Sequence, residues 1–404
     1  MNQRFAHQNA LPVQPFFSTP QQRLALARQR YFEEGVRPSG LVSEGVIQSW
    51  ARCLQAARRP DETVSFATVT ASRAHSALTR SRVMLAAATS ELSQLENTLA
   101  GTCCSVLLTD PQGVVVHWAR AGYNPDEVLL PLARRIGCNL AEDSIGTNAL
   151  GLTAHTGEPS LVLGGEHFFG SVQVLHCAAA PIRDIHGQVA GVLDVTSESR
   201  PFGFDAASVV GQYATVIENR LLRAQSAEHI VLHLQTSPAL LGTPMEALAG
   251  ITSDGRIAWM NRAATRLMGM VPTNGESRAD TVFALDLNSL AALTRRSEPS
   301  AHRLPNGLNV WMLARMQARD GLRQAIQMGA SASASAGASA AHVAAPLHDH
   351  PNGYEPASGT LRSSELHLIT RTLQACDGNV SKAARTLGVS RGLVYRHLKQ
   401  ARPG

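Results

Sequence analysis

Lysine is almost missing from this chain of 404 residues. Only Lys382 and Lys399 occur, although the sequence holds 36 basic residues in all. A phosphate-binding loop of the Walker type needs a Gly–Lys–Ser/Thr step, whereas Ser381 and Leu398 precede the two lysines here. The printed sequence therefore contains no Walker loop.

Paired cysteines and long apolar runs are missing as well. The six cysteines include no Cys-x-x-Cys pair, so neither a disulfide framework nor a zinc site is predicted. No stretch is apolar for the roughly eighteen residues that a membrane helix needs, and Met1 to Pro20 lacks the apolar run of a signal peptide. We therefore expect a soluble, cytoplasmic protein with free thiols and no membrane contact.

A recognisable set of catalytic residues is missing as well. No pattern pairs a nucleophile with a base, and isolated serine, histidine and aspartate residues are common in a chain of this length. We therefore expect a protein that is not an enzyme and needs no cofactor and no metal. The net charge of +5 is a mild basic excess that suits a nucleic-acid partner.

The C-terminal stretch 378–399 has the pattern of two short helices joined by a tight turn. Asn379 is suited to cap the first helix, and apolar side chains recur at helical spacing over 380–387. Gly388 suits the left-handed backbone that ends a helix, and Ser390 can cap the helix that follows. This arrangement is typical of a helix-turn-helix that binds DNA.

The second helix of this motif carries the predicted DNA contacts. Arg391 and Arg396 can each bond the two acceptors of a guanine, while Lys399 is placed to contact the phosphate backbone. The alternative interpretation is a helical hairpin with an ordinary solvated charged face. The predicted DNA-binding residues are Ser390, Arg391, Gly392, Leu393, Tyr395, Arg396 and Lys399.

The same residues closely resemble the C-terminal helix-turn-helix of the Fis family. In that family the segment from Asn379 to Lys399 would read DNA, and the preceding helix, here Ser364 to about Cys376, would form a dimer. The resemblance implies a DNA-binding domain over residues 359–404 and a homodimer.

The N-terminal part begins with residues 1–20, which we expect to be disordered, followed by helical patterns over 21–58 and 81–99. In the second pattern, apolar residues recur at alternating steps of three and four. This short heptad seam fits either an internal core face or a dimer contact. Its members are Leu85, Ala88, Leu92, Leu95 and Leu99.

Between residues 103 and 197 the pattern alternates strands and turns. Two β-hairpins are predicted, one over 105–118 and one over 179–195, with a helix over 127–136 between them. A long helix over 205–224 follows. A sheet with flanking helices indicates an α+β domain of the kind that serves as a sensor.

Three separated motifs in this region resemble the GAF domain of regulators of the acetoin-catabolism type. They are AEDSIGTNALG at 141–151, GEHF at 165–168 and CAAAPIRD at 177–184. The resemblance implies that a domain over residues 21–225 senses a small molecule, without saying which one. Each candidate contact also has a structural interpretation as a cap, turn or core residue. The candidate ligand-binding residues are Glu142, Thr147, Asn148, Glu166, His167 and His176.

A second unit is predicted over residues 226–320, with a hairpin at 248–260 and a helix capped by Asn261. It resembles a PAS-like module, and a plain helix–strand spacer is the alternative. Residues 321–358 are rich in alanine and serine and are expected to be a flexible linker. The predicted fold class is α+β and multidomain, with an antiparallel GAF-type sensor, a PAS-like module and an all-α helix-turn-helix.

Full-length regulators that these domains resemble place an ATPase that acts with the sigma factor sigma-54 between sensor and helix-turn-helix. Here only about forty residues, 321–360, lie in that place. We therefore expect a dimeric DNA-binding transcription regulator without an ATPase motor, which responds to a small-molecule effector. RNA polymerase or a full-length activator is a further expected partner. The alternatives are a modulator of a full-length sigma-54 activator and an architectural DNA-binding protein.

Overall fold

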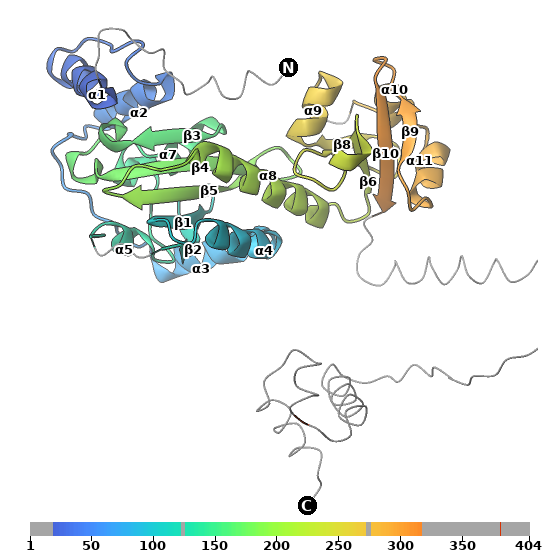
Figure 1. The fold of residues 1–404 in the computed structure, drawn as a ribbon, viewed down its shortest axis with the longest axis horizontal. Coiled ribbons are helices and arrows are strands. Elements are labelled where there is room, and N and C mark those ends of the chain that lie inside the picture. The colour runs from blue at the N-terminus through green and yellow to red at the C-terminus, as the bar shows by residue number, and fades with distance from the viewer. Residues whose placement is uncertain (1–18, 123–125, 272–275, 317–379, 381–404) are drawn as a thin grey trace, which may run out of the picture. The chain divides into compact units, whose positions relative to one another are not determined.

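The computed structural model describes residues 19–122, 126–271 and 276–316, together with Val380 (Figure 1). The chain divides into two units, Met1–Ala334 and Ser335–Gly404. The described part of the first unit contains two five-stranded antiparallel sheets with helices, which confirms the predicted α+β class. The expected linker over 321–358 and, apart from Val380, the expected DNA-binding domain over 359–404 lie outside the described residues.

The helical region at the N-terminus is divided into separate helices rather than running through from 21 to 58. The hydroxyl of Thr19 accepts a hydrogen bond from the Gln22 amide at 3.2 Å and so caps the first helix. Ser43 caps the second helix in the same way, through the Val46 amide. These elements are α1 (Pro20–Arg28), a π-helical turn (Gln29–Glu33), α2 (Glu44–Gln55), α3 (Ala71–Arg80) and α4 (Arg82–Thr98).

The first sheet has the strand order β2-β1-β5-β4-β3, and all neighbouring strands are antiparallel. Both predicted hairpins are confirmed, although β4 begins before the predicted residue 179 and β5 runs beyond 195. The strands are β1 (Cys104–Thr109), β2 (Val115–Arg120), β3 (Ser160–Leu163), β4 (Leu175–Arg183) and β5 (Val189–Glu198).

The helix predicted over 127–136 contains only a four-residue α-helix, because Arg134 leaves the helical conformation with ψ 53°. The long helix predicted over 205–224 is confirmed. The helices of this region are α5 (Leu130–Ala133), α6 (Glu142–Ile145), α7 (Ala149–Thr156) and α8 (Ala206–Gln225), with 3-10 turns at Gly164–Glu166 and Gly170–Val172.

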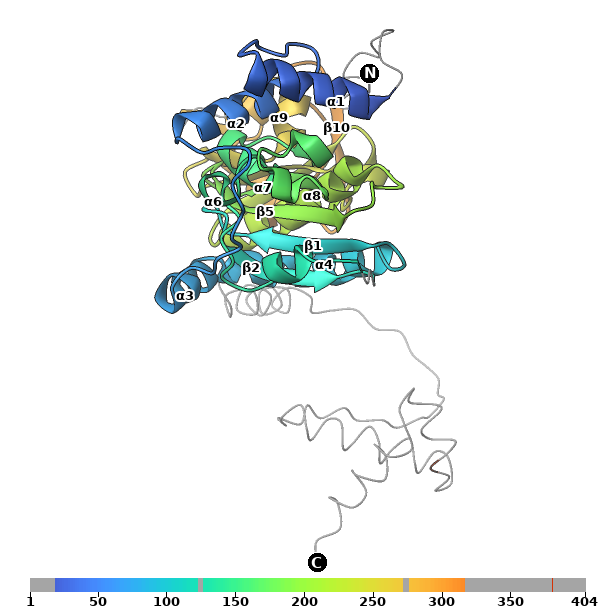
Figure 2. The ribbon, with the colours of Figure 1, turned by 90° about the vertical axis from the view of Figure 1, so that its left-hand side faces the viewer.

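Both faces of the first sheet are buried, since helices cover each of them (Figure 2). The side chains of β1 alternate accordingly: Leu107 packs with α2 and α7, whereas Val106 and Leu108 pack with α4 and α8. Strand β4 follows the same rule with Cys177 on the α7 side and Ala178 on the α8 side. The result is a three-layer domain with a separate core on each side of the sheet.

The heptad seam of α4 belongs to one of these cores. Ala88, Leu92, Leu95 and Leu99 are at most 3% exposed and pack with α8 and the sheet. The seam is therefore an internal core face. The alternative interpretation as a dimer contact is wrong for these four side chains, because they are already buried within the chain.

The second sheet has the order β8-β7-β6-β10-β9 and a core of its own. The predicted hairpin at 248–260 is confirmed, and the Asn261 side chain accepts from the Ala264 amide as the expected cap. The elements are β6 (Ile230–Gln235), a 3-10 turn (Pro238–Leu240), β7 (Ala247–Ile251), β8 (Ile257–Met260), α9 (Arg262–Met268), α10 (Ala279–Phe283), α11 (Leu287–Thr294), β9 (Ser300–Arg303) and β10 (Asn309–Met316).

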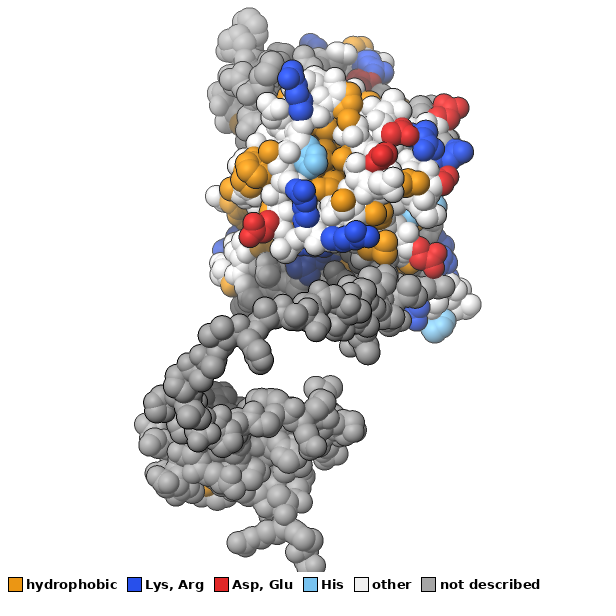
Figure 3. All heavy atoms as spheres, turned by 90° about the vertical axis from the view of Figure 1, so that its right-hand side faces the viewer, with side chains coloured by type: hydrophobic (Ala, Val, Ile, Leu, Met, Phe, Trp, Pro, Cys, Tyr) orange, Lys and Arg blue, Asp and Glu red, His pale blue; other side chains and the backbone are white. Residues whose placement is uncertain are grey.

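The region from β6 to β10, within the first unit, is a folded α+β body, which overturns the interpretation of residues 226–320 as a plain helix–strand spacer. Its relation to PAS modules stays a prediction. On the face shown in Figure 3, hydrophobic side chains lie between arginines and carboxylates. Exposed apolar residues of the unit include Leu287, Leu308 and Trp311. In the part of the chain that the structure describes, we find no helix long and apolar enough to span a bilayer.

Candidate ligand-binding site

The first sheet carries a cavity of about 30 Å³ on its α7 side, which is room for about two water molecules. Its floor comes from β1, β4 and β5, and its roof from α5, α6, α7 and the residues that lead into β4. Most of the lining is apolar. The lining residues are Phe66, Leu107, Leu130, Ala133, Leu140, Ile145, Asn148, Leu150, His167, Val172, Leu175, Cys177, Asp194 and Thr196.

Asp194 is the acidic residue of this lining, and it is 0% exposed. It lies on β5 with Leu107 and Ala179 as its cross-strand neighbours. The Thr196 hydroxyl donates to Oδ2 at 2.5 Å, whereas Oδ1 has no hydrogen-bond partner among the described residues. Burial raises the pKa of Asp194 to about 7, although the bond from Thr196 works in the opposite direction. Near neutral pH the carboxyl can thus exist with or without its proton.

His167 and Cys177 form a neutral pair in the same cavity. Nδ1 of His167 lies 2.9 Å from the Gly164 carbonyl and so carries the proton, which leaves Nε2 to accept from the Cys177 thiol at 3.5 Å. Burial lowers the pKa of His167 to about 4, and burial raises the pKa of Cys177. Neither side chain is charged at neutral pH.

Asn148 reaches the cavity as the cap of α7. Its Oδ1 accepts from the Gly151 amide at 2.9 Å, and its Nδ2 donates to the Gly146 carbonyl at 2.7 Å. Gly146 has a φ of +68°, and a β-carbon at this position would lie 2.8 Å from the Phe169 ring. The glycine of the 141–151 motif is therefore required for backbone conformation and space.

Two of the predicted ligand contacts, Glu142 and Thr147, lie outside the cavity and join helices instead. Glu142 forms an ion pair with Arg52 at 2.6 Å and accepts from the Ser49 hydroxyl at 2.8 Å. The Ser49 hydroxyl also bonds the buried Thr147 hydroxyl at 2.7 Å. These contacts hold α2 against α6 and the start of α7.

Glu166 and His176 are also absent from the cavity lining. Glu166 accepts from the Leu163 amide at 2.8 Å, and burial raises the pKa of Glu166 to about 7. His176 is half-buried and packs edge-on against Phe202. Of the six predicted contacts, the structure thus brings only Asn148 and His167 to the cavity.

Asp194 and Thr196 are cavity residues that the sequence prediction missed. The stretch 188–195 was predicted simply as a strand. An available signal was a lone carboxylate in an otherwise apolar run, since an inward-facing charge on a buried strand requires either a partner or a function. The alternation of side-chain directions along β5 does not by itself show which residues cover the Asp194 carboxylate.

Two residues beyond Thr196 on the same strand face, Glu198 holds the roof. Its carboxylate accepts from the amides of Val128, Leu129 and Leu130 at 2.9–3.1 Å, at the start of α5. Leu130 itself lines the cavity. One face of β5 therefore carries both Asp194, in the floor of the cavity, and Glu198, which binds the amides at the start of α5 in the roof.

Comparison with known proteins identifies both ends of the chain. Residues 19–212 match the family model described as MimR, N-terminal domain, and residues 360–400 match the one described as Bacterial regulatory protein, Fis family. The chain joins a MimR-type N-terminal domain to a Fis-type helix-turn-helix. Both resemblances noted in the sequence are confirmed at this level.

Two relatives of this region are described as transcriptional or catabolic regulators. The propane 2-monooxygenase operon transcriptional activator MimR of Mycolicibacterium smegmatis is 28% identical over 309 residues, covering 74% of this chain and 48% of the relative. The acetoin catabolism regulatory protein of Cupriavidus necator is 32% identical over 224 residues, covering 53% of this chain and 33% of the relative. This chain thus spans half or less of these relatives' length.

A solved structure, the E. coli DhaR(N)–DhaL complex, matches with a TM-score of 0.41 and 16% identity, covering 67% of this chain and 99% of that one.

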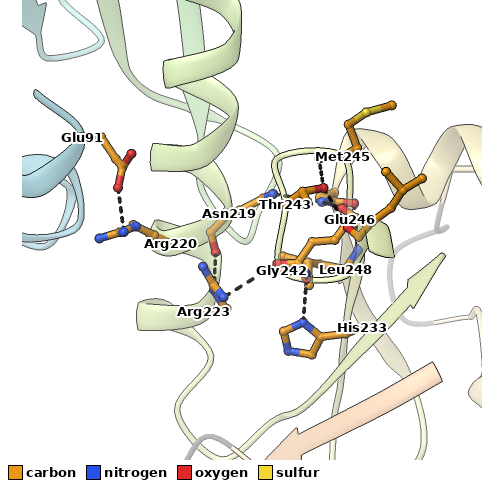
Figure 4. Close-up of polar contacts among 12 residues, drawn as sticks. Glu91, Asn219, Arg220, Arg223, His233, Gly242, Thr243, Met245, Glu246 and Leu248 are labelled. Carbon is orange, nitrogen blue, oxygen red and sulfur yellow. Dashed lines mark hydrogen bonds and ion pairs between the residues drawn. The ribbon is translucent and has the colours of Figure 1, made fainter. Parts of the chain in front are cut away.

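The long helix α8 (Ala206–Gln225) begins within the matched residues 19–212 and connects the first sheet to the second (Figure 4). Arg220 on α8 forms an ion pair with Glu91 of α4 at 2.6 Å, and one turn later Arg223 lies 3.7 Å from Glu246, which directly precedes β7. The buried Glu246 also accepts from His233 Nδ1 at 3.0 Å and from the Gly242 amide at 2.8 Å. Helix α8 therefore contacts both α4 and the residue that precedes β7.

A second contact strengthens this joint. The Asn261 amide donates to the Asn219 side chain at 2.9 Å, and the Trp259 indole donates to the Ser226 hydroxyl at 2.9 Å. Leu222, at the end of α8, packs with Trp259 of the second sheet.

Within the described residues, no group of three or more His, Cys, Asp or Glu side chains is arranged to hold a metal ion.

Proposed function

We propose that this chain is a DNA-binding transcription regulator whose MimR-type domain senses a small molecule. The observation that carries the proposal is the match of residues 360–400 to the Fis-type helix-turn-helix, in one chain with a cavity-bearing domain. The regulators of propane and acetoin metabolism named above share this class of function. The protein acts on DNA in the cytoplasm as a homodimer and is not an enzyme.

The route of the signal runs through α8. A ligand that changes the packing of the first sheet shifts α8 relative to α4, and the contacts of Arg220 and Arg223 pass that shift toward the second sheet. The Ala/Ser-rich stretch 321–358 then connects to the DNA-binding segment. A flexible tether transmits orientation poorly, so the effector acts on dimerisation or on contact with RNA polymerase.

A second candidate function is a modulator that pairs with a full-length activator. The observation that favours it is that both lysines of the printed sequence, Lys382 and Lys399, fall within the helix-turn-helix match, so these residues hold no Walker lysine. In either function the chain works without an ATPase of its own, and the motor is supplied by a partner or is not used.

Genome-wide footprinting of the bound protein, with transcripts compared in a strain that lacks it, tests the proposal. Discrete peaks that share an inverted repeat, beside genes whose transcripts change, are the expected result. Peaks that disappear when a motor-bearing partner is deleted indicate the modulator. Diffuse binding without a shared motif contradicts a specific regulator and indicates an architectural DNA-binding protein.

Base reading is tested by two substitutions in the full chain. Arg391→Ala is expected to weaken operator binding by about 1–3 kcal/mol and to relax the preference at one base pair, because a bidentate contact to guanine is lost. Lys399→Ala is expected to weaken all sequences alike and to reduce the salt slope by about 1. Equal losses of Arg391→Ala on operator and random DNA would contradict its role. Arg59→Ala, at an exposed arginine paired with Asp61 in the first domain, is the control.

A further inference from the structure

A second pocket lies where the end of β4, the middle of α8 and the start of α9 meet. Its volume is about 50 Å³, which is room for about three water molecules. It shares no lining residue with the cavity beside Asp194. Small side chains, among them those of Ala180, Pro181 and Ala214, form apolar walls, and charged side chains interrupt them.

Glu218 on α8 brings a buried carboxylate to this pocket. The residue is 8% exposed, and its Oε2 accepts from the main-chain amide of Arg183 at 2.9 Å. Among the described residues, no donor bonds the second oxygen, Oε1. Burial raises the pKa of Glu218, while the positive charges of Arg183 and Arg262 oppose that shift. A ligand that places a further positive donor beside Oε1 would therefore stabilise the charged carboxylate.

Arg183, at the end of β4, brings a guanidinium group to the same pocket. Its Nη2 bonds the Gly157 carbonyl and lies 3.7 Å from a carboxylate oxygen of Glu158. The N–H donors on Nε and Nη1 have no hydrogen-bond partner among the described residues. The group can therefore take a carboxylate as a further partner.

Arg262, the first residue of α9, adds a second positive charge to the lining. It forms an ion pair with Glu158 at 2.5 Å, and the two side chains are 41% and 51% exposed. The pocket thus faces solvent beside this pair. Ion pairs with such exposure are weak, so the Glu158 carboxylate can give way to that of a ligand.

The two signs of charge exclude simpler ligands. A ligand that is only anionic would meet the buried Glu218 carboxylate, and one that is only cationic would meet Arg183 and Arg262. A ligand with an ammonium group and a carboxylate group complements both signs. Because Glu218 receives the main-chain amide of Arg183, the two side chains start from neighbouring points of the wall, so one small molecule can reach both.

The volume limits the rest of the ligand. Room for about three water molecules accommodates two charged groups on one carbon atom, with a short apolar side chain against the small walls. A long side chain would have to extend past Arg262 and Glu158 into solvent.

We propose that the pocket between β4, α8 and α9 binds a small zwitterion of the α-amino-acid class. The Glu218 carboxylate accepts from its ammonium group, and the Arg183 guanidinium donates to its carboxylate. Because the lining comes from both α8 and α9, the bound molecule ties the first sheet to the region from β6 to β10. This inference goes beyond the proposed function and does not depend on DNA binding.

Three probes of the same shape test the ligand class on the full chain. L-alanine carries both charges, L-lactate has a hydroxyl in place of the ammonium group, and L-alaninamide has an amide in place of the carboxylate. Calorimetric titration is expected to give one site per chain for L-alanine, with an affinity at least about tenfold above that of either other probe, because each of them lacks one charge-assisted contact. Equal or tighter binding of L-lactate or L-alaninamide overturns the proposal, as does an absence of L-alanine binding.

Two variants link the binding to the pocket. Glu218→Gln keeps an acceptor for the Arg183 amide but removes the charge, so it is expected to abolish the preference for L-alanine over L-lactate. If that variant does not fold, Gly211→Leu serves instead. A β-carbon at Gly211, which lines the pocket from α8, meets no atom within 4 Å, so leucine can fill the pocket without displacing the helix.

Gly211→Leu is expected to abolish binding of every probe. Gln212→Leu, at the adjacent exposed position of α8, is the matched control and should bind L-alanine like the unaltered protein. Unchanged binding of L-alanine in Gly211→Leu places the probe elsewhere and overturns the proposal.

Discussion

Two buried carboxylates, Asp194 in the first sheet and Glu246 beside the second, have opposite surroundings. Asp194 in the first sheet has one donor, Thr196, and one open oxygen. Glu246 beside the second sheet is 2% exposed and receives hydrogen bonds from His233 and the Gly242 amide, with Arg223 nearby. Burial raises the pKa of Asp194 to about 7. Burial alone would raise the pKa of Glu246 too, but the bonds and charges around it hold that pKa below its ordinary value.

The difference is one of hydrogen-bond satisfaction. A buried carboxylate with a full set of partners stabilises the structure that supplies them, as Glu246 does for the joint between α8 and the second sheet. A buried carboxylate with an open oxygen costs stability, and such a cost is common where a protein binds something. The two buried acids thus differ in their partners and in the direction of their pKa shifts.

The largest expected effect on stability comes from replacing Glu246, the buried acid whose carboxylate has several partners. Glu246→Ala should lower the free energy of unfolding by roughly 3–5 kcal/mol at pH 7, because Arg223 and His233 lose a buried acceptor. Urea denaturation followed by tryptophan fluorescence measures it. A loss below that of the control Asp254→Ala, an exposed acid paired with Arg256, would show that the joint is not a stabilising element.

The stability difference between wild type and Glu246→Ala should depend on pH. Since the pKa of Glu246 lies below its ordinary value of 4.5, its contribution to stability is present above pH 4.5 and is lost as the pH falls through the lowered pKa. Wild type and Glu246→Ala are therefore expected to approach one another in stability as the solution becomes more acidic than pH 4.5.

The contribution of Asp194 to stability should depend on pH in the opposite direction. Because the pKa of Asp194 is raised from 3.8 to about 7, its contribution to stability is greatest below pH 3.8 and declines as the pH rises through 7. Asp194→Asn removes this titration. Relative to wild type, the variant should gain roughly 4 kcal/mol between pH 4 and pH 8, from about three pKa units at about 1.36 kcal/mol each. Melting temperatures measured across that range test it, and parallel curves for the two proteins would contradict the raised pKa.

The smallest expected effect concerns the one donor to Asp194. Thr196→Val keeps the shape of the side chain but removes its hydroxyl, so it should cost about 1 kcal/mol at pH 8 and less at pH 5. It should also move the pH transition assigned to Asp194 upward. Thr215→Val, which removes a hydroxyl bonded to the Gly211 carbonyl of α8, is the control and should show no such change with pH.

The fold of the first domain was largely predictable because its signals are local. Turns at Asp110–Gly113 and Asp184–Gly187 fixed both hairpins, and helical periodicity fixed α8. The helix expected over 127–136 is only one turn long. The amides at its start donate to Glu198, a residue about 70 positions away, and Arg134 leaves the helical conformation.

The candidate site was harder to predict than the fold. The motifs predict contacts at Asn148 and His167, which line the cavity, and at Glu142 and Thr147, which join α2 to α6 and α7; ligand binding by all four stays a prediction. A motif shows that a residue matters without showing whether it faces a ligand or another helix. Asp194 was missed because its significance depends on which strands lie beside it and which side chains cover it.

The sequence by itself determined three hairpins, the helix α8, the cap at Asn261 and the match of residues 360–400 to a Fis-type helix-turn-helix, because capping, periodicity and motif spacing are properties of neighbouring residues. Only the tertiary structure decided that the seam of α4 is a core face, that Asp194 has an open oxygen and that Glu246 does not. The physical reason is that burial and hydrogen-bond satisfaction depend on segments that meet in space from distant parts of the chain.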